Sequence, residues 1–145
     1  MRTVNNYMKM AIAGYSKNES LARMCAAAFL SQLDPTVEEM SDIKAAVSEA
    51  VTNCIVHGYR DTIGEIDIRM KIINGDTFYI KITDKGTGIA DIEQAMQPMF
   101  TTSPDGERAG LGFAVMESFT DSLKVRSAPG KGTSVTMMKK IDRRG

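Results

Sequence analysis

The sequence predicts a two-layer α/β sandwich, in which helices cover one face of a mostly antiparallel sheet. Apolar and polar residues alternate as in strands at 7–15, 65–73, 78–82, 122–127 and 133–140. Helical periodicity fills the long stretch between the first two of these segments. The strands are apolar on one side only, which is typical of antiparallel sheets covered on one face. Helices and strands do not alternate as in βαβ units, so the order of elements favours the sandwich.

Composition sets the class of molecule. A chain of 145 residues, 43% of them apolar, is typical of one globular domain, here 1–145. Eighteen basic and eighteen acidic residues cancel, so charge gives no argument for direct binding of nucleic acid. No window reaches the ~18 apolar residues of a membrane helix, and no leader pattern opens the chain. We therefore expect a cytoplasmic domain with no membrane partner.

The first part of the chain predicts a strand and a helix. Residues 7–15 place Met8, Met10 and Ile12 on one side of a strand. Ser16 with Glu19 forms a capping-box pattern that predicts the start of a helix. One stripe of that helix is expected to carry Leu21, Met24, Cys25, Ala28 and Gln32.

A second, longer helix follows. Asp34 is suited to cap it and Pro35 to occupy its first position. Its buried stripe is expected at Ile43, Val47, Ala50, Val51 and Cys54. Gly58 is expected to end it. The two cysteines, Cys25 and Cys54, lie among small apolar residues and are expected to be free thiols.

The rest of the chain predicts two hairpins separated by helical segments. Asn74-Gly75 is a strong two-residue turn signal between the strands at 65–73 and 78–82. A short helix is expected at 91–97, ended by Pro98. Residues 98–110 have no periodicity and predict a mobile loop. A helix is then expected from Gly110 to about Phe119, before the final hairpin around 128–132.

Glu49, Asn53 and His57 follow one another at four-residue steps, so they share a helix face. An amide oxygen suits Mg²⁺ that phosphate oxygens already partly neutralise, which makes Asn53 a candidate metal ligand. Glu49, one turn away, is a candidate general base. The alternative is a solvated helix face. His57 is then either a helix-end residue or a neighbour of phosphate.

Asp84 ends an apolar strand, and Gly86 and Gly88 follow it. A carboxylate at this position accepts a hydrogen bond from the amino group of adenine, whereas guanine presents an acceptor there. The glycines let the backbone approach a base closely and permit positive φ. The alternative is an ordinary polar loop after a strand.

Gly110-Leu111-Gly112 opens the last predicted helix, where free backbone amides are able to bind phosphate. Arg108, just before it, has a fork of donors that suits a terminal phosphate. Thr133 follows Gly132 at the start of the last strand. The alternatives are a glycine cap and a plain hairpin turn. A Walker motif and the protein-kinase signatures are absent from the sequence.

In this order and spacing, the motifs resemble the four boxes of the histidine-kinase-like (GHKL, Bergerat) ATP-binding fold, which gyrase, the heat-shock chaperone, sensor histidine kinases and mismatch-repair ATPases share. Glu49 to Asn53 resembles the N box. Asp84, Gly86 and Gly88 resemble the first glycine box, and Gly110-Leu111-Gly112 the second. Gly132-Thr133 resembles the final box. The resemblance implies that these residues and His57 bind ATP or ADP.

Further segments are similar to the anti-sigma F factors of spore-forming bacteria, namely 18–23, 48–59, 97–102 and 108–113. The resemblance implies a homodimer that sequesters sigma factor F. It also implies that the protein uses ATP and Mg²⁺ to phosphorylate a serine of an anti-anti-sigma factor, a STAS-domain protein.

This second resemblance also implies roles for single residues. Glu49 would be the general base, Asn53 the Mg²⁺ ligand, Asp84 the adenine acceptor and 98–110 the ATP lid. Glu19 and Arg23 match positions at the partner-binding surface. The sequence departs from the family at Cys54 and Val56 and in a turn-rich lid at 103–106.

Three alternative functions remain open at this point. One is a kinase of the same family that controls a stress sigma factor, the anti-sigma B type. Another is a nucleotide-gated binding module without catalysis. A third is the detached ATPase domain of a sensor kinase, which would phosphorylate a histidine of its partner.

Overall fold

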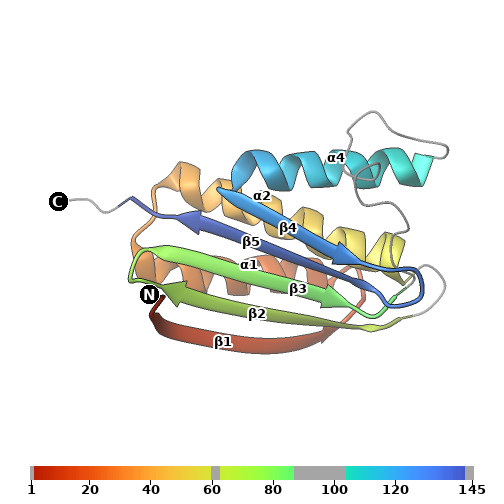
Figure 1. The fold of residues 1–145 in the computed structure, drawn as a ribbon, viewed down its shortest axis with the longest axis horizontal. Helices are drawn as coiled ribbons and strands as arrows, with labels where there is room; N and C mark the ends of the chain where they lie inside the picture. The colour runs from red at the N-terminus through yellow and green to blue at the C-terminus, as the bar shows by residue number, and fades with distance from the viewer. Residues whose placement is uncertain (1, 60–62, 87–103, 143–145) are drawn as a thin grey trace.

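The computed structural model describes residues 2–59, 63–86 and 104–142 and confirms the two-layer sandwich (Figure 1). The strands are β1 (Val4–Ala13), β2 (Glu65–Ile73), β3 (Thr77–Asp84), β4 (Ser122–Ser127) and β5 (Thr133–Lys140). The helices are α1 (Asn18–Leu30), α2 (Val37–Asn53) and α4 (Pro104–Phe119), with a 3₁₀ turn η1 (Ser31–Leu33) and a π-helical turn η2 (Cys54–Gly58).

The five described strands form one sheet in the order β1-β2-β3-β5-β4. All four pairings between them are antiparallel. The three helices lie side by side on one face of this sheet, and the other face carries none of the described helices (Figure 1). The core between the layers contains Ile12 from β1, Ile68 from β2 and Ile80 from β3.

Strand β1 begins at Val4, earlier than the expected start at residue 7. Its first residues pair with the end of β2, where Val4 lies opposite Ile73. The predicted apolar face is confirmed, because Ile12 is buried and Met8 and Met10 are partly buried against the core.

Two expectations for α1 were wrong. Its N-cap is Lys17, with no side-chain cap, so Ser16 and Glu19 do not form a capping box. The carboxylate of Glu19 instead accepts hydrogen bonds from Arg23. The stripe is also different, since Leu21 and Met24 are 47% and 65% exposed. The buried residues of α1 are Ala22, Ala26, Phe29 and Leu30.

The buried stripe of α2 is confirmed. The predicted start of the helix, with Asp34 as its cap, was wrong. Thr36 is the N-cap, and its hydroxyl accepts a hydrogen bond from the Glu39 amide at 3.0 Å. The Glu39 carboxylate accepts one from the Thr36 amide at 2.8 Å, which completes a capping box. Asp34 instead has a φ of 52°, the left-handed turn that precedes the helix.

Gly58 ends the helical path, as expected, but through the π-helical turn η2, which the sequence pattern did not indicate. The amide of Tyr59 closes this turn by donating to the carbonyl of Cys54 at 3.0 Å. Wider turns of this kind are common at functional sites. Here the turn brings Gly58 and Tyr59 to the end of β3.

The hairpin prediction is confirmed, since Asn74 and Gly75 have φ angles of 55° and 72° between β2 and β3. The last hairpin, β4 to β5, is confirmed as well. Helix α4 begins at Pro104 and not at Gly110. A proline at the first helical position explains this start, because its φ is already helical. The expected helix at 91–97 and the residues 98–103 lie outside the described residues.

Candidate functional site

Asp84 stands at the end of β3 and is only 3% exposed. Among the described residues, Asp84 is the only charged residue that is buried. Its Oδ1 accepts a hydrogen bond from the Gly86 amide at 2.8 Å. A buried carboxylate is costly unless hydrogen bonds or a ligand compensate, so its place at a strand end marks a candidate binding position.

Burial raises the pKa of Asp84, and hydrogen bonds from Gly86, Cys54 and Thr133 partly offset that rise. Cys54 lies on η2, one helical turn before Gly58, and is buried. Its thiol has a pKa raised well above the ordinary value, first through burial and then through the nearby charge of Asp84. The carboxylate is thus held between a strand, a turn and a helix end.

Two glycines let the backbone close around Asp84. A methyl group on Gly58 would lie 2.8 Å from the Asp84 carboxyl carbon. A methyl group on Gly86 would lie 1.9 Å from the carbonyl oxygen of Gly58. Only glycine fits at such distances, so the first glycine of the predicted Asp-x-Gly-x-Gly pattern is explained by packing on η2. Gly88 lies outside the described residues.

Thr133 lies opposite Asp84 on β5. The preceding Gly132 has a φ of 81°, and a methyl group there would lie 2.1 Å from the Asp84 carbonyl oxygen. The Thr133 hydroxyl is 2.8 Å from that of Ser127. The predicted final box therefore adjoins the first glycine box at one end of the sheet.

The second cluster lies between α2 and α4. A methyl group on Gly112 would lie 3.1 Å from Glu49 Oε2, 3.3 Å from Asn53 Nδ2 and 3.4 Å from Asn53 Oδ1. Gly112 is buried, so its missing side chain makes room for the acid and the amide. The structure thus brings together three predicted site residues from two distant segments.

The side-chain nitrogen of Asn53 is buried and has no hydrogen-bond partner in the described part of the chain. An orphaned amide of this kind is costly in a folded protein and fits a site that a ligand completes. The amide oxygen is a hard ligand that suits Mg²⁺. No group of three His, Cys, Asp or Glu able to hold a metal occurs among the described residues. Phosphate oxygens and water would then supply the other ligands, as is usual for Mg²⁺.

Cys54 follows Asn53 directly and connects the two clusters, since it contacts Asp84 while Asn53 faces Gly112. His57 lies on the same π-helical turn, with its Nε2 buried. Gly110 and Leu111 lie within α4, whose start at Pro104 moves them away from the helix N-terminus. The expected helix start at Gly110 is therefore wrong, and binding of phosphate by Gly110 and Leu111 stays a prediction. The side chain of Arg108 lies outside the described part.

Glu19 and Arg23 form an ion pair on α1, with 2.8 Å between Glu19 Oε1 and Arg23 Nη1. The same Nη1 is 3.3 Å from the Ser48 hydroxyl on α2. The pair is partly exposed, so a partner is able to reach it. It adjoins the predicted catalytic helix instead of the nucleotide cluster at Asp84.

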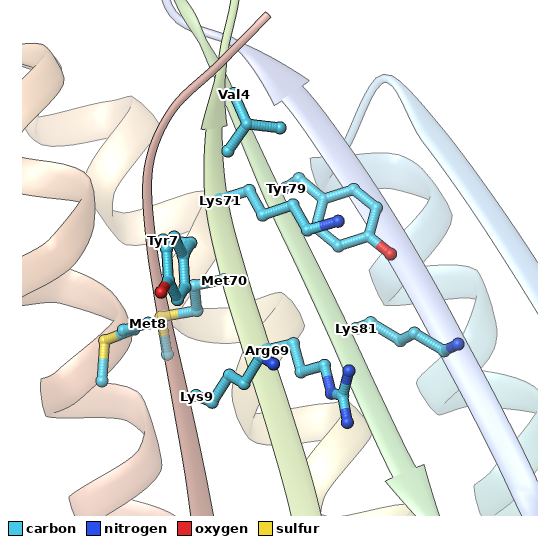
Figure 2. Close-up of a pocket in the computed structure, with 9 residues that line it drawn as sticks. All are labelled: Val4, Tyr7, Met8, Lys9, Arg69, Met70, Lys71, Tyr79 and Lys81. Atoms are coloured by element: carbon cyan, nitrogen blue, oxygen red, sulfur yellow. The ribbon is translucent and has the colours of Figure 1, made fainter.

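Sequence reasoning did not place Cys54 beside Asp84, and it included Tyr59 in the segment 48–59 without giving it a role. The signal for Cys54 was its place directly after Asn53, where the helix turns toward the sheet. A separate hollow of about 380 Å³ lies on the helix-free face and contains none of the predicted site residues (Figure 2). Among its lining residues are Lys9, Arg69 and Lys81.

Comparison with known proteins gives the family. Residues 16–139 match the family described as histidine kinase-like ATPase domain. The chain is 57% identical over 136 residues to an anti-sigma F factor of Thermoanaerobacter sp. (strain X514), covering 94% of each chain. The chain belongs to the anti-sigma F factor family of histidine kinase-like ATPases.

Other relatives agree. An anti-sigma F factor of Clostridium acetobutylicum is 50% identical over 138 residues, covering 95% of this chain and 96% of that one. The fold is also similar to part of the crystal structure of the RsbU and RsbW domains of Rv1364c from Mycobacterium tuberculosis, with a TM-score of 0.70 and 17% identity. That match covers 97% of this chain and 34% of the other. None of the helices in the described ranges is long and apolar enough to cross a membrane.

Proposed function

We propose that this chain is a cytoplasmic, homodimeric anti-sigma factor that inhibits sigma factor F and acts as an ATP-dependent serine kinase on an anti-anti-sigma factor of the STAS type. The family and the relatives' name support the sigma-binding part. The kinase part is supported by one observation above all, the convergence of Glu49 and Asn53 on Gly112.

The nucleotide would extend from Asp84 toward Asn53. The buried carboxylate of Asp84 would accept a hydrogen bond from the adenine amino group and repel the acceptor that guanine presents. Gly86 and Thr133, which adjoin Asp84 at the sheet end, would border the base. The buried Asn53 amide nitrogen has a free donor for a phosphate oxygen, and its oxygen would hold Mg²⁺. When bound, Mg²⁺ supplies charge neutralisation at the phosphates.

In the proposed reaction the serine oxygen of the partner attacks the terminal phosphorus of ATP. The bond between that phosphorus and its bridging oxygen breaks, and ADP leaves. Glu49 accepts the serine proton, because its carboxylate is one helical turn from Asn53 and hence beside the phosphates. The protein contributes mainly by positioning and by electrostatic stabilisation, as in other phosphoryl transfers.

The test is incubation with labelled ATP and the anti-anti-sigma factor. Wild type should yield acid-stable phosphoserine. Glu49→Gln should retain ATP and sigma factor binding and lose transfer by at least about a hundredfold, the typical contribution of a general base. Transfer by Glu49→Gln at the wild-type rate would refute the role of Glu49. An acid-labile product would indicate histidine phosphorylation, the reaction of a sensor-kinase domain.

Two further arms separate the remaining alternatives. Capture assays with sigma factor F and with a stress sigma factor distinguish the anti-sigma F type from the anti-sigma B type, and the relatives at 50–57% identity favour the former. Absence of any phosphorylated product from wild type, with ATP binding intact, would indicate a nucleotide-gated module without catalysis.

A further inference from the structure

Tyr59 connects three segments that meet at the end of the sheet. It follows the π-helical turn η2 directly. Its hydroxyl accepts a hydrogen bond from the Lys85 amide at 2.7 Å and donates one to the Glu65 carbonyl oxygen at 2.7 Å. One phenol therefore joins the helix end, the start of β2 and the turn that follows β3.

The ring of Tyr59 is closely packed. A methyl group on Gly64 would lie 2.1 Å from its Cε1, and one on Gly14 would lie 3.5 Å from its Cδ2. The amide of Gly14 donates to the carbonyl of Gly64 at 2.7 Å, which closes the backbone on that side of the ring. Gly64 thus makes room for the aromatic ring, and its hydrogen bond with Gly14 holds the backbone beside the ring.

The Lys85 amide is the point at which Tyr59 acts on the candidate nucleotide site. Lys85 lies between Asp84 and Gly86, and the Gly86 amide donates to Asp84 Oδ1 at 2.8 Å. Gly86 itself rests on the carbonyl of Gly58. Fixing the Lys85 peptide therefore fixes the turn on which the orientation of the Asp84 carboxylate depends.

We propose that Tyr59 is a positioning residue for base selection. Its hydroxyl holds the Asp84–Gly86 turn so that the buried carboxylate faces the amino group of the adenine. This inference rests on the proposed function, in which Asp84 reads adenine. Tyr59 touches no nucleotide atom in this scheme and acts only through the backbone of Lys85.

The test compares Tyr59→Phe with Tyr79→Phe, which removes a hydroxyl from the opposite, helix-free face, where Lys71 lies over the Tyr79 ring at 5.0 Å (Figure 2). Dissociation constants are measured for ATP and for purine riboside triphosphate, which lacks the amino group. Wild type should prefer ATP. Tyr59→Phe should lose about tenfold in ATP affinity, the size of one well-placed hydrogen bond, with little change for the analogue. Tyr79→Phe should match wild type for both.

The outcomes separate the two ideas. Equal binding of both nucleotides by wild type would refute base reading by Asp84, and the inference about Tyr59 with it. A wild-type preference that Tyr59→Phe retains would overturn the role of Tyr59 alone. A parallel loss for both nucleotides would also overturn it, since it would reflect general loosening.

A second measurement applies if Tyr59→Phe does not fold. In the nucleotide-free wild type, the Lys85 amide should be protected from hydrogen exchange although Lys85 is an exposed residue, because it donates to the phenol. Strong protection supports the inference. Exchange at the rate of an open loop would overturn it.

Discussion

Arg23 on α1 lies 3.3 Å from the hydroxyl of Ser48 on α2, and Ser48 directly precedes Glu49. The same guanidinium is paired with Glu19. The predicted partner-binding pair is therefore attached to the helix that carries the predicted general base. A partner that draws Arg23 away from Ser48 would change the contacts of that helix, which gives a physical route between the proposed partner surface and the proposed kinase site.

Arg23→Ala should weaken binding of sigma factor F by at least tenfold and leave ATP affinity unchanged, because Arg23 does not contact the nucleotide clusters. Stability should fall by no more than about 1 kcal/mol, since the ion pair is partly exposed. Binding is measured by calorimetry and stability by thermal melting. Arg69→Ala is the matched control, as it removes an exposed arginine paired with Asp67 at 3.1 Å on the other face. Equal sigma binding by both variants would count against the predicted surface.

Gly112→Ala should lower phosphoryl transfer by about tenfold or more without lowering the melting temperature. The new methyl group would stand 3.1 Å from Glu49 Oε2, so the carboxylate must move. The flexible end of a glutamate yields at little cost, while alanine in a helix interior gains about 1 kcal/mol over glycine. Transfer is followed with labelled ATP and stability by circular dichroism. Full activity in this variant would show that Glu49 is not confined by Gly112.

The sheet and the central helix followed from sequence because period-two and helical apolar patterns decide which face is buried. The buried face of helix α1 could not be predicted in this way, because small apolar side chains are buried there and larger ones are exposed. The small residues Ala22 and Ala26 are buried, while the larger Leu21 and Met24 are exposed. Alanines permit α1 to lie close to its neighbours, and a pattern of apolar residues alone does not reveal this advantage.

The candidate site was predicted in part. Motif spacing indicated Asp84, Gly86, Asn53 and Glu49, and the structure places them in two adjoining clusters. Tyr59 was not found, since its partners are backbone groups of Lys85 and Glu65, which carry no signal in side-chain patterns. The expected phosphate site at Gly110 assumed that the helix begins at this glycine, whereas α4 begins at Pro104.

ATP binding should weaken as pH falls, and at a higher pH than an ordinary aspartate would cause, because burial raises the pKa of Asp84. A carboxyl with a raised folded-state pKa binds more protons when folded than when unfolded. It therefore favours folding at low pH, and that contribution is lost as pH rises through the folded pKa.

Asp84→Asn provides the control for both effects. It removes the titrating group and keeps an oxygen that accepts from the Gly86 amide. Its melting temperature relative to wild type should rise as pH rises through the titration of Asp84, and its ATP affinity should be nearly independent of pH. Parallel pH profiles of wild type and Asp84→Asn would contradict the assignment of the titration to Asp84.

Thr36→Ala and Ser16→Ala test the revised helix starts against each other. Thr36 exchanges two hydrogen bonds with Glu39 at the start of α2, so its replacement should cost about 1 kcal/mol. Ser16 does not cap α1 with its side chain, so its replacement should change stability by less than about 0.5 kcal/mol. Both are measured by urea unfolding. A larger loss from Ser16→Ala than from Thr36→Ala would restore the cap that the sequence pattern indicated and the structure does not contain.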